Sequence, residues 1–332
     1  MKVVIPAAGA GKRLYPHTYT KPKPMVYVAG KPIIGHILDK AVDLQPDELI
    51  IVVGYMKEKL IDYVDEHYCG IFKKITYVHQ DQQLGLGHSI YVAREAIDDA
   101  PIMIALGDMI FKGGYSDFAR LHACNGKCSG SIGVKEIDNP SHYGIVFLNG
   151  DGTIKKMVEK PKKSSSRLGI AGVYFIDDTP GLIRALEKVV ENRGEGEVQL
   201  TDALQKAIEA GSDYKPFEVS SWYDCGRPES LLEVNRLLLA EKSKMSWKPR
   251  NSILIEPVCV GQDVEIENSI IGPNVSISDG ARITSSIIED SIIGSHAEIR
   301  RMALRSSIVG DGAIISGKAN SLNIGDSSTI EF

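Results

Sequence analysis

Up to about residue 245, short apolar runs alternate with stretches whose apolar positions follow a helical spacing. The apolar runs predict buried strands at 3–5, 49–53, 74–79 and 102–106, and the stretches between them predict helices at 56–66 and 87–96. This alternation predicts an α/β domain with a mostly parallel sheet and helices on both faces. Ligands of such sheets bind beyond the carboxyl ends of the strands. The turn after Pro6 and the dipeptide Gly107-Asp108 both follow such ends.

After residue 250 the pattern changes to a short repeat. Four segments share one template, in which an aliphatic residue recurs after six positions and glycine follows the first; they are 260–266, 271–277, 293–299 and 309–315. This step predicts a left-handed parallel β-helix, whose coils stack their aliphatic residues inside. A set of ordinary β-hairpins would not repeat the same six-residue spacing of aliphatic residues in four segments. Because the repeat is a stacking module, we expect it to act in oligomerisation and capping.

A helix expected from Pro228 onward gives way to a polar stretch, which marks the domain boundary. With 332 residues, the chain is long enough for two domains. We therefore expect a catalytic-type domain at 1–240, a linker at 241–250 and the β-helix at 251–332.

Composition excludes several classes of function. The net charge of −5 does not favour nucleic acid as a partner. No apolar run reaches the length of a membrane span, and we expect no signal peptide, because the first apolar run is a short strand. Five scattered cysteines suit a reducing, cytoplasmic location. Cys124 and Cys128 could face each other across one helical turn, but no second ligand pair at zinc spacing accompanies them, so a metal site there is not favoured.

The first loop carries the clearest chemical signal. After the strand ends at Pro6, two glycines form a tight turn and several cations follow; they are Gly9, Gly11, Lys12, Arg13, Lys21 and Lys23. Free backbone N–H groups together with cations suit a polyphosphate, although a surface turn with a solvated basic segment has the same composition. A dinucleotide fingerprint is excluded because Leu14 replaces its third glycine, and a P-loop is excluded because Pro6 replaces its first.

Three further segments carry candidate chemistry, each with a plain structural alternative. Gln80 precedes a glycine-rich turn and could read a pyrimidine edge, or it could be an exposed glutamine. Asp108 follows an apolar strand and could hold Mg²⁺, or it could form a turn or helix cap. Glu159-Lys160 combines a carboxylate, which suits hydroxyl groups, with a lysine, which suits a phosphate, or it could be a solvated pair. For Thr201 or Asp202 we expect a structural role as the cap of the next helix.

In this order and spacing, the segments resemble the sugar-1-phosphate nucleotidylyltransferases. The signature of that family is matched by residues 9–18 followed by Pro22-Lys23-Pro24, and its W-x-D-x-G element by 222–226. Lys12 departs from the signature, which usually has a small hydroxyl residue there, so a hydroxyl contact to the phosphates is not expected. The motif Gly85-Leu86-Gly87-His88 most resembles the corresponding segment of bacterial UTP–glucose-1-phosphate uridylyltransferases.

The resemblance implies a Rossmann-like nucleotidyltransferase domain that transfers a nucleotidyl group from UTP or dTTP to a sugar 1-phosphate, with glucose 1-phosphate expected. It implies catalytic roles for Arg13, Lys23, Asp108 and Lys160. The nucleotide-binding residues implied are Ala8, Gly9, Gly11, Lys12, Arg13, Gln80 and Gly85. The sugar-phosphate-binding residues implied are Lys23, Gly144, Glu159, Lys160 and Tyr174, and the Mg²⁺ ligands are Asp108 and Asp224.

Two alternatives to this function remain open on the sequence. Some relatives join such a domain to a CoA-dependent acyltransferase β-helix, and His296 is the only histidine of the repeat region. A non-catalytic nucleotide-sugar-binding regulatory subunit would be expected to lack one of the key charged residues, whereas Arg13, Lys23, Asp108 and Asp224 are all present. Met109 stands where the thymidylyltransferase branch often has asparagine, which removes one expected polar contact to the sugar. We expect a homo-oligomer.

Overall fold

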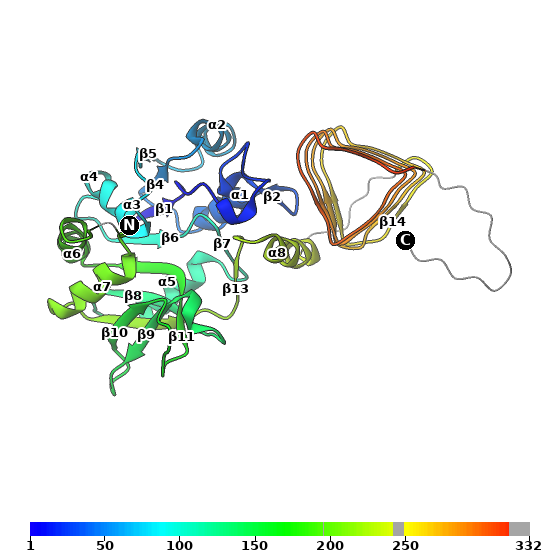
Figure 1. Cartoon of the computed structure of the whole chain (residues 1–332). Coiled ribbons are helices and arrows are strands. Elements are labelled where there is room, and N and C mark those ends of the chain that lie inside the picture. Colours follow the sequence, from blue (N-terminus) through cyan, green and yellow to red (C-terminus); the bar gives the residue numbers. More distant parts are fainter. Residues whose placement is uncertain (195, 242–248, 319–332) are drawn as a thin grey trace. The chain divides into compact units, whose positions relative to one another are not determined.

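The computed structural model describes residues 1–194, 196–241 and 249–318 (Figure 1). Contacts divide the chain into two units, of which the first comprises Met1–Val26 and Lys31–Leu231 and the second comprises Tyr27–Gly30 and the chain from Leu232 onward. The predicted boundary after residue 240 differs from this division, because most of the helix before it belongs to the second unit. Of the predicted linker 241–250, residues 242–248 lie outside the described part of the chain.

The first unit contains a mixed sheet, with the central order β6-β1-β4-β5 all parallel. Its described strands are β1 (Lys2–Pro6), β4 (Glu48–Val53), β5 (Ile75–His79), β6 (Ile102–Ala105), β8 (Gly130–Glu136), β9 (Gly144–Leu148), β10 (Ile154–Glu159), β11 (Leu168–Ile176) and β12 (Tyr214–Glu218). Strand β11 is antiparallel to β6, β8 and β9. The first unit also contains β3 (Lys31–Pro32) and a small pair of β7 (Met109–Phe111) with β13 (Trp222–Asp224), whereas β2 (Tyr27–Val28) belongs to the second unit.

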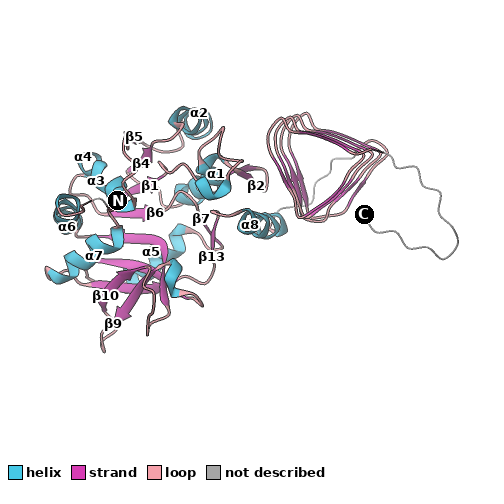
Figure 2. Cartoon of the chain, viewed as in Figure 1, coloured by secondary structure: helices cyan, strands magenta, loops and turns pink. Residues whose placement is uncertain are grey.

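Helices alternate with these strands, as the sequence predicts (Figure 2). The α-helices are α1 (Ile33–Val42), α2 (Lys57–Tyr68), α3 (Leu86–Val92), α4 (Arg94–Ile97), α5 (Tyr115–Cys124), α6 (Thr179–Glu191), α7 (Leu200–Glu209) and α8 (Pro228–Ala240). The short 3₁₀ helices are η1 (Lys12–Leu14), η2 (Lys23–Met25) and η3 (Pro140–His142). The single helix predicted at 87–96 is two helices, α3 and α4, which meet at Ala93. No helix in the described ranges is both long and apolar enough to cross a bilayer.

The core of the first unit explains why its central strands are continuous apolar runs. All six residues of β4 are buried, and Val3, Val4 and Ile5 of β1 are fully inaccessible. Strands that are covered on both faces consist of continuous apolar residues, whereas strands with one exposed face alternate apolar and polar residues. Apolar residues of α3, α6 and α7 pack together against β1, β4 and β6 in one cluster. The carboxyl ends of β1 and β6 therefore lie side by side at one edge, where the candidate site forms.

The second unit contains the predicted left-handed β-helix, drawn as a triangular coil in Figure 2. Its three parallel sheets are β14 (Ile253–Leu254), β17 (Ile270–Ile271), β20 (Ile287–Glu289) and β23 (Ala303–Arg305); β15 (Val258–Val260), β18 (Val275–Ile277), β21 (Ile292–Ile293) and β24 (Ile308–Val309); and β16 (Glu265–Glu267), β19 (Arg282–Thr284), β22 (Glu298–Arg300) and β25 (Ile314–Ser316). The repeating aliphatic residues form its core. At one corner, Ser269 and Ser286 each donate a backbone N–H to the serine hydroxyl 17 residues earlier.

Candidate active site

The first loop is held in shape by hydrogen bonds to the carbonyl of Gly11. Thr18 donates its hydroxyl to that oxygen over 2.9 Å, and the backbone N–H of Leu14 donates to it over 2.9 Å. Gly11 has φ of +69°, and a Cβ there would lie 2.7 Å from the Cβ of Lys23. Only glycine suits both the left-handed backbone and the close approach. The loop is therefore packed directly against Lys23, as a phosphate-binding loop with a neighbouring cation requires.

Asp108 and Asp224 are brought together by the short sheet of β7 and β13. Met109 pairs with Asp224 in that sheet, and the backbone N–H of Cys225 donates to the carbonyl of Asp108 over 3.0 Å. Lys23 donates a hydrogen bond to the Asp108 carboxylate, and its Nζ lies 3.5 Å from Asp224 Oδ1. Two carboxylates, from segments more than 100 residues apart, thus share one buried ammonium group.

The charges in this cluster depend on one another. Burial lowers the pKa of Lys23, but Asp108 and then Asp224 raise it by more, so the net pKa is above its ordinary value and the side chain stays charged. Arg13 adds a further cation at the rim, with its guanidinium 3.8 Å from Asp224 Oδ2 and a side chain that is 60% exposed. The cluster therefore presents cations from two directions to an incoming polyanion.

The two carboxylates also fit a magnesium ion. Asp224 Oδ1 is buried and accepts no hydrogen bond, although it forms the ion pair with Lys23. A buried carboxylate oxygen without a donor is costly, and a metal ion satisfies it. Mg²⁺ is commonly held by one or two carboxylates together with substrate phosphate oxygens. The donor set of Asp108 and Asp224 thus suits Mg²⁺, and their neighbour Lys23 balances part of their charge.

A cavity of about 360 Å³ opens between the first loop and the turn after β5. It is lined by Pro6, Ala7, Ala8, Gly9, Lys23, Pro24, Gln80, Gln83, Gly85, Leu86, Ser89, Leu106, Gly107, Asp108 and Glu197. Six residues assigned to the site from the sequence are among them: Ala8, Gly9, Lys23, Gln80, Gly85 and Asp108. The sequence reasoning missed Ser89, whose buried hydroxyl has no hydrogen-bond partner, and Gln83, which donates to the carbonyl of Ala8 over 3.2 Å.

The side-chain amide of Gln80 has a defined orientation in this cavity. Its Nε2 lies 3.3 Å from the carbonyl of Gly85 and 2.9 Å from Nδ1 of His88. A carbonyl oxygen can only accept, so the amide atom facing Gly85 must be the nitrogen. Nδ1 of His88 is then the acceptor of the second amide hydrogen. With both hydrogens used, the carbonyl oxygen of Gln80 is the group left to meet a ligand.

A second group of polar residues forms where β9 and β10 meet α7. Gly144 pairs with Glu159 across these strands, and Thr201 donates its hydroxyl to Glu159 Oε2 over 2.6 Å. Lys160 Nζ lies 3.2 Å from the other oxygen, Oε1, and its side chain is 55% exposed. The carboxylate of Glu159 is thereby fixed by a hydroxyl on one oxygen and a mobile cation on the other.

The prediction that Thr201 or Asp202 caps the next helix is wrong. Helix α7 begins at Leu200, and Gln199 is its N-cap residue, so both residues lie inside the first turn. The helix starts earlier than expected because Leu200 is needed in the core, where it is 1% exposed. The hydroxyl of Thr201 is then free to reach Glu159, a contact between residues 42 apart in sequence. Nothing in the local sequence around Thr201 indicates this partner.

The two groups are joined by aromatic residues. Tyr143, directly before Gly144, packs edge-on against Trp222 with ring centroids 4.9 Å apart, and Trp222 begins the strand that ends at Asp224. Burial, followed by the charge of Asp224, raises the pKa of Tyr143. Tyr174, assigned to sugar binding from the sequence, is 3% exposed and packs in the core. Lys12 is exposed beside Arg13.

Comparison with known proteins finds a matching family model and several similar proteins. A family model described as nucleotidyl transferase matches residues 2–241. The chain is 34% identical over 277 residues to the bifunctional protein GlmU of Methanococcus maripaludis, covering 82% of this chain but only 62% of that protein's length. It is 29% identical to the glucose-1-phosphate thymidylyltransferase of Streptomyces antibioticus, with 100% of this chain and 99% of the relative covered. A solved structure of UDP-glucose pyrophosphorylase with UDP-glucose superimposes with TM-score 0.63 and 27% identity, covering 73% of this chain and 99% of that one.

Proposed function

The chain belongs to the nucleotidyl transferase family, and on that premise we propose that it transfers a nucleotidyl group from UTP or dTTP to a sugar 1-phosphate, releasing pyrophosphate. Glucose 1-phosphate is the proposed acceptor, since one relative is a glucose-1-phosphate thymidylyltransferase and the similar solved structure contains UDP-glucose. One observation carries the proposal: the glycine loop, the buried Lys23 and the carboxylates of Asp108 and Asp224 meet at one edge of the sheet.

The choice of UTP or dTTP rests on Gln80. Its carbonyl oxygen is the free end of the amide, so it can accept a hydrogen bond from a base that carries an N–H group. Uracil and thymine carry N3–H at the centre of their pairing edge, whereas cytosine and adenine present a lone pair at the corresponding nitrogen. A site built to bond an N–H group rejects analogues without it by about 10⁴-fold or more. The methyl group that separates thymine from uracil adds only one apolar contact.

The phosphate chemistry falls to the first loop and the charged cluster. A phosphate oxygen of the sugar 1-phosphate attacks the α-phosphorus in line, and the bond to pyrophosphate breaks. Ala8, Gly9, Gly11 and Lys12 contribute the loop that holds the polyphosphate, and Arg13 neutralises the leaving pyrophosphate. Lys23 offsets the charge as the two anions approach. Mg²⁺ held by Asp108 and Asp224 supplies charge neutralisation on the phosphate oxygens when bound.

The acceptor is held by the second group. The carboxylate of Glu159, fixed by Thr201, accepts hydrogen bonds from sugar hydroxyls. Gly144 leaves room for this pair, since a Cβ there would lie 2.9 Å from the Thr201 hydroxyl and 3.1 Å from Glu159 Oε2. Lys160, with its exposed flexible side chain, binds the sugar phosphate as a point charge. Catalysis in this proposal consists of positioning and charge stabilisation, without a covalent protein intermediate.

Purified full-length protein with Mg²⁺ and a panel of five NTPs and several sugar 1-phosphates tests the proposal, with pyrophosphate release as the readout. We expect turnover with UTP, dTTP or both, and none above background with CTP and ATP. GTP is the informative purine, because guanine also carries an N–H at its pairing edge. Turnover with CTP at a rate within tenfold of UTP would refute the role given to Gln80. Absence of pyrophosphate release with every pair would refute the reaction.

The β-helix is proposed to act in assembly rather than in acyl transfer. His296 is exposed on a turn of the coil, where a surface histidine is expected. We propose a homo-oligomer and, because all five cysteines are free thiols, a reducing cytoplasmic location.

A further inference from the structure

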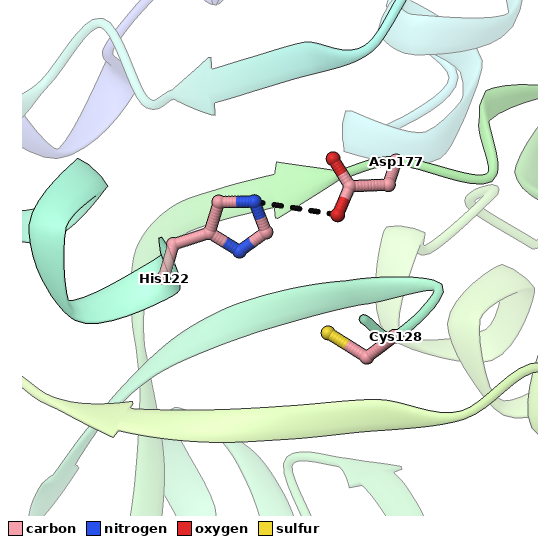
Figure 3. A group of neighbouring side chains, drawn as sticks. All are labelled: His122, Cys128 and Asp177. Carbon is pink, nitrogen blue, oxygen red and sulfur yellow. Dashed lines mark ion pairs between the residues drawn. The ribbon is translucent and has the colours of Figure 1, made fainter. Parts of the chain in front are cut away.

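A second cluster of potential ligands lies at the edge of the sheet opposite the candidate active site. His122 on α5, Cys128 in the turn before β8 and Asp177 directly after β11 place their ligand atoms within 4.8 Å of one another (Figure 3). Strand β11 is antiparallel to β6, with Ile176 opposite Ile102, so Asp177 lies near the start of β6. Asp108 follows the other end of β6. The two groups of residues are therefore separated by the length of that strand.

We propose that His122, Cys128 and Asp177 bind a divalent transition metal ion, Zn²⁺ in particular. Imidazole nitrogen, thiolate sulfur and carboxylate oxygen are the ligand types that zinc takes in proteins. Nε2 of His122 lies 3.3 Å from Asp177 Oδ2. Two ligand atoms that are each about 2.0–2.1 Å from a tetrahedral ion lie about 3.3 Å apart, so this pair already has the spacing of two zinc ligands.

The imidazole is held in the orientation that ligation needs. Nδ1 of His122 lies 2.9 Å from the hydroxyl of Ser131, which also accepts a hydrogen bond from Asn125 over 3.0 Å. The ring stacks on Phe175, with centroids 4.9 Å apart and an angle of 9° between the planes. Metal-binding histidines characteristically use the other ring nitrogen in such a contact, which fixes the ring and its tautomer. Here that contact leaves Nε2 to face Asp177.

The charge of the ligands and the solvent access of the cluster also suit a metal ion. The Cys128 thiol is buried and points its hydrogen toward the carbonyl of Gly130 over 3.3 Å. Binding replaces that hydrogen: the S–H bond breaks, the proton leaves to solvent and the thiolate binds the ion. Thiolate and carboxylate then match the charge of a dication. The Asp177 side chain is 43% exposed, which leaves room for a water as the fourth ligand.

The test uses Co²⁺, a spectroscopic substitute for zinc, with full-length protein that has been reduced and treated with chelator. One equivalent of Co²⁺ should produce the intense tetrahedral bands and a thiolate-to-cobalt charge-transfer band, and Zn²⁺ should displace it. Cys128→Ser should abolish the charge-transfer band. Cys124→Ser is the matched control, because this exposed cysteine is the last residue of α5, four positions before Cys128, and should leave the spectrum unchanged.

Two further variants test the site even if the Cys128→Ser variant fails to fold. Asp177→Asn, at a half-exposed position, should weaken Zn²⁺ binding and remove the stabilisation that Zn²⁺ gives against thermal unfolding. Ser131→Ala, which removes the contact to Nδ1, should weaken binding by about 10–100-fold. Absence of tetrahedral bands would overturn the proposal and leave His122 and Asp177 as a simple ion pair. A charge-transfer band that survives in Cys128→Ser would also overturn it and indicate one of the other free cysteines as the ligand.

Discussion

Thr201 and Glu159 form a hydrogen bond of 2.6 Å that joins helix α7 to the end of β10. The bond occupies one carboxylate oxygen and so directs the other toward Lys160 and the proposed sugar site. Asp202 lies next to this pair, and burial, followed by the charge of Glu159, raises its pKa. The first turn of α7 therefore belongs to the candidate site.

Thr201→Val should raise the KM for the sugar 1-phosphate by about tenfold, because the Glu159 carboxylate loses its donor and its fixed orientation. The KM for the NTP should change little. Initial-rate kinetics with each substrate varied in turn measures the difference. Thr201→Ser keeps the hydroxyl and should retain near wild-type values; if it is as impaired as the valine variant, the loss is not specific to the hydrogen bond.

The Asp108→Asn and Asp224→Asn variants should lose more than about tenfold in turnover, which corresponds to about 1.4 kcal/mol in barrier height. Replacing one carboxylate oxygen by an amide keeps the shape but lowers the charge that holds Mg²⁺. Activity should be measured over a range of Mg²⁺ concentrations, with circular dichroism to confirm the fold. Asp99→Asn, at an exposed position, is the control. Turnover above a tenth of wild type in either variant contradicts the ligand assignment of that residue.

The sequence predicts the parts of this protein that depend on the regular spacing of its apolar residues. Parallel strands bring their carboxyl ends to one edge, which is why the loop after Pro6 and Asp108 could be placed together in advance. The six-residue step likewise predicts the β-helix, because each repeat buries the same aliphatic position. Both inferences use only the period of the local pattern, which a single chain displays directly.

Contacts set by tertiary packing could not be predicted in the same way. Thr201 reaches Glu159 only because α7 packs on β10, and His122 of α5 meets Asp177 only because its ring stacks on Phe175 of β11. Neither neighbour relationship follows from sequence order. The isolated Ser89 hydroxyl gave no signal for the same reason, since its lack of a partner is visible only in the folded cavity.

Arg13→Ala should mainly raise the KM for the NTP, and Lys160→Ala mainly the KM for the sugar 1-phosphate. Each variant removes a charge-assisted contact to a different substrate, with some loss of kcat. Two-substrate kinetics separates the effects. Lys162→Ala, a change at an exposed neighbouring lysine, controls for general loss of charge near Lys160. Equal effects of both variants on both substrates would argue against this division of roles.

The affinity for UTP should fall at low pH through His88. Burial, followed by the charge of Arg193, holds the pKa of His88 below its ordinary value of 6.5, so the ring is neutral at pH 7 and Nδ1 can accept from Gln80. As the pH falls below 6.5 and through this lowered pKa, Nδ1 gains a hydrogen and the contact to the amide hydrogen is lost. The carbonyl of Gln80 then turns toward His88 and away from the base.

Because substrate phosphates also titrate near pH 6, the measurement is the ratio of kcat/KM for UTP between wild type and His88→Asn. Asparagine keeps an acceptor for the Gln80 amide and does not titrate. The ratio should be constant from pH 8 to 6.5 and should fall below that range. A ratio that stays flat down to pH 5 would show that His88 does not control the orientation of Gln80.

Deleting residues 251–332 should leave nucleotidyl transfer measurable but change assembly and solubility. Every residue assigned to chemistry precedes the deletion. Asn235 of α8, however, is 1% exposed, accepts from the backbone N–H of Ala29 and from Ser276, and donates to the carbonyl of Asn274. Truncation removes the last two of these partners and uncovers the side of α8 that carries Asn235.

Light scattering on the full-length and truncated proteins measures the effect. We expect the full-length chain to be a dimer or a tetramer, because closed assemblies with two-fold symmetry are commonest. The truncated chain should form a smaller oligomer or be less soluble. Asp290→Asn in the full-length chain weakens the two hydrogen bonds from Arg236 of α8. It should lower the thermal stability of the second unit while keeping the mass of the assembly. A monomeric full-length protein, with no change in mass or solubility on truncation, would mean that the β-helix serves a purpose other than assembly.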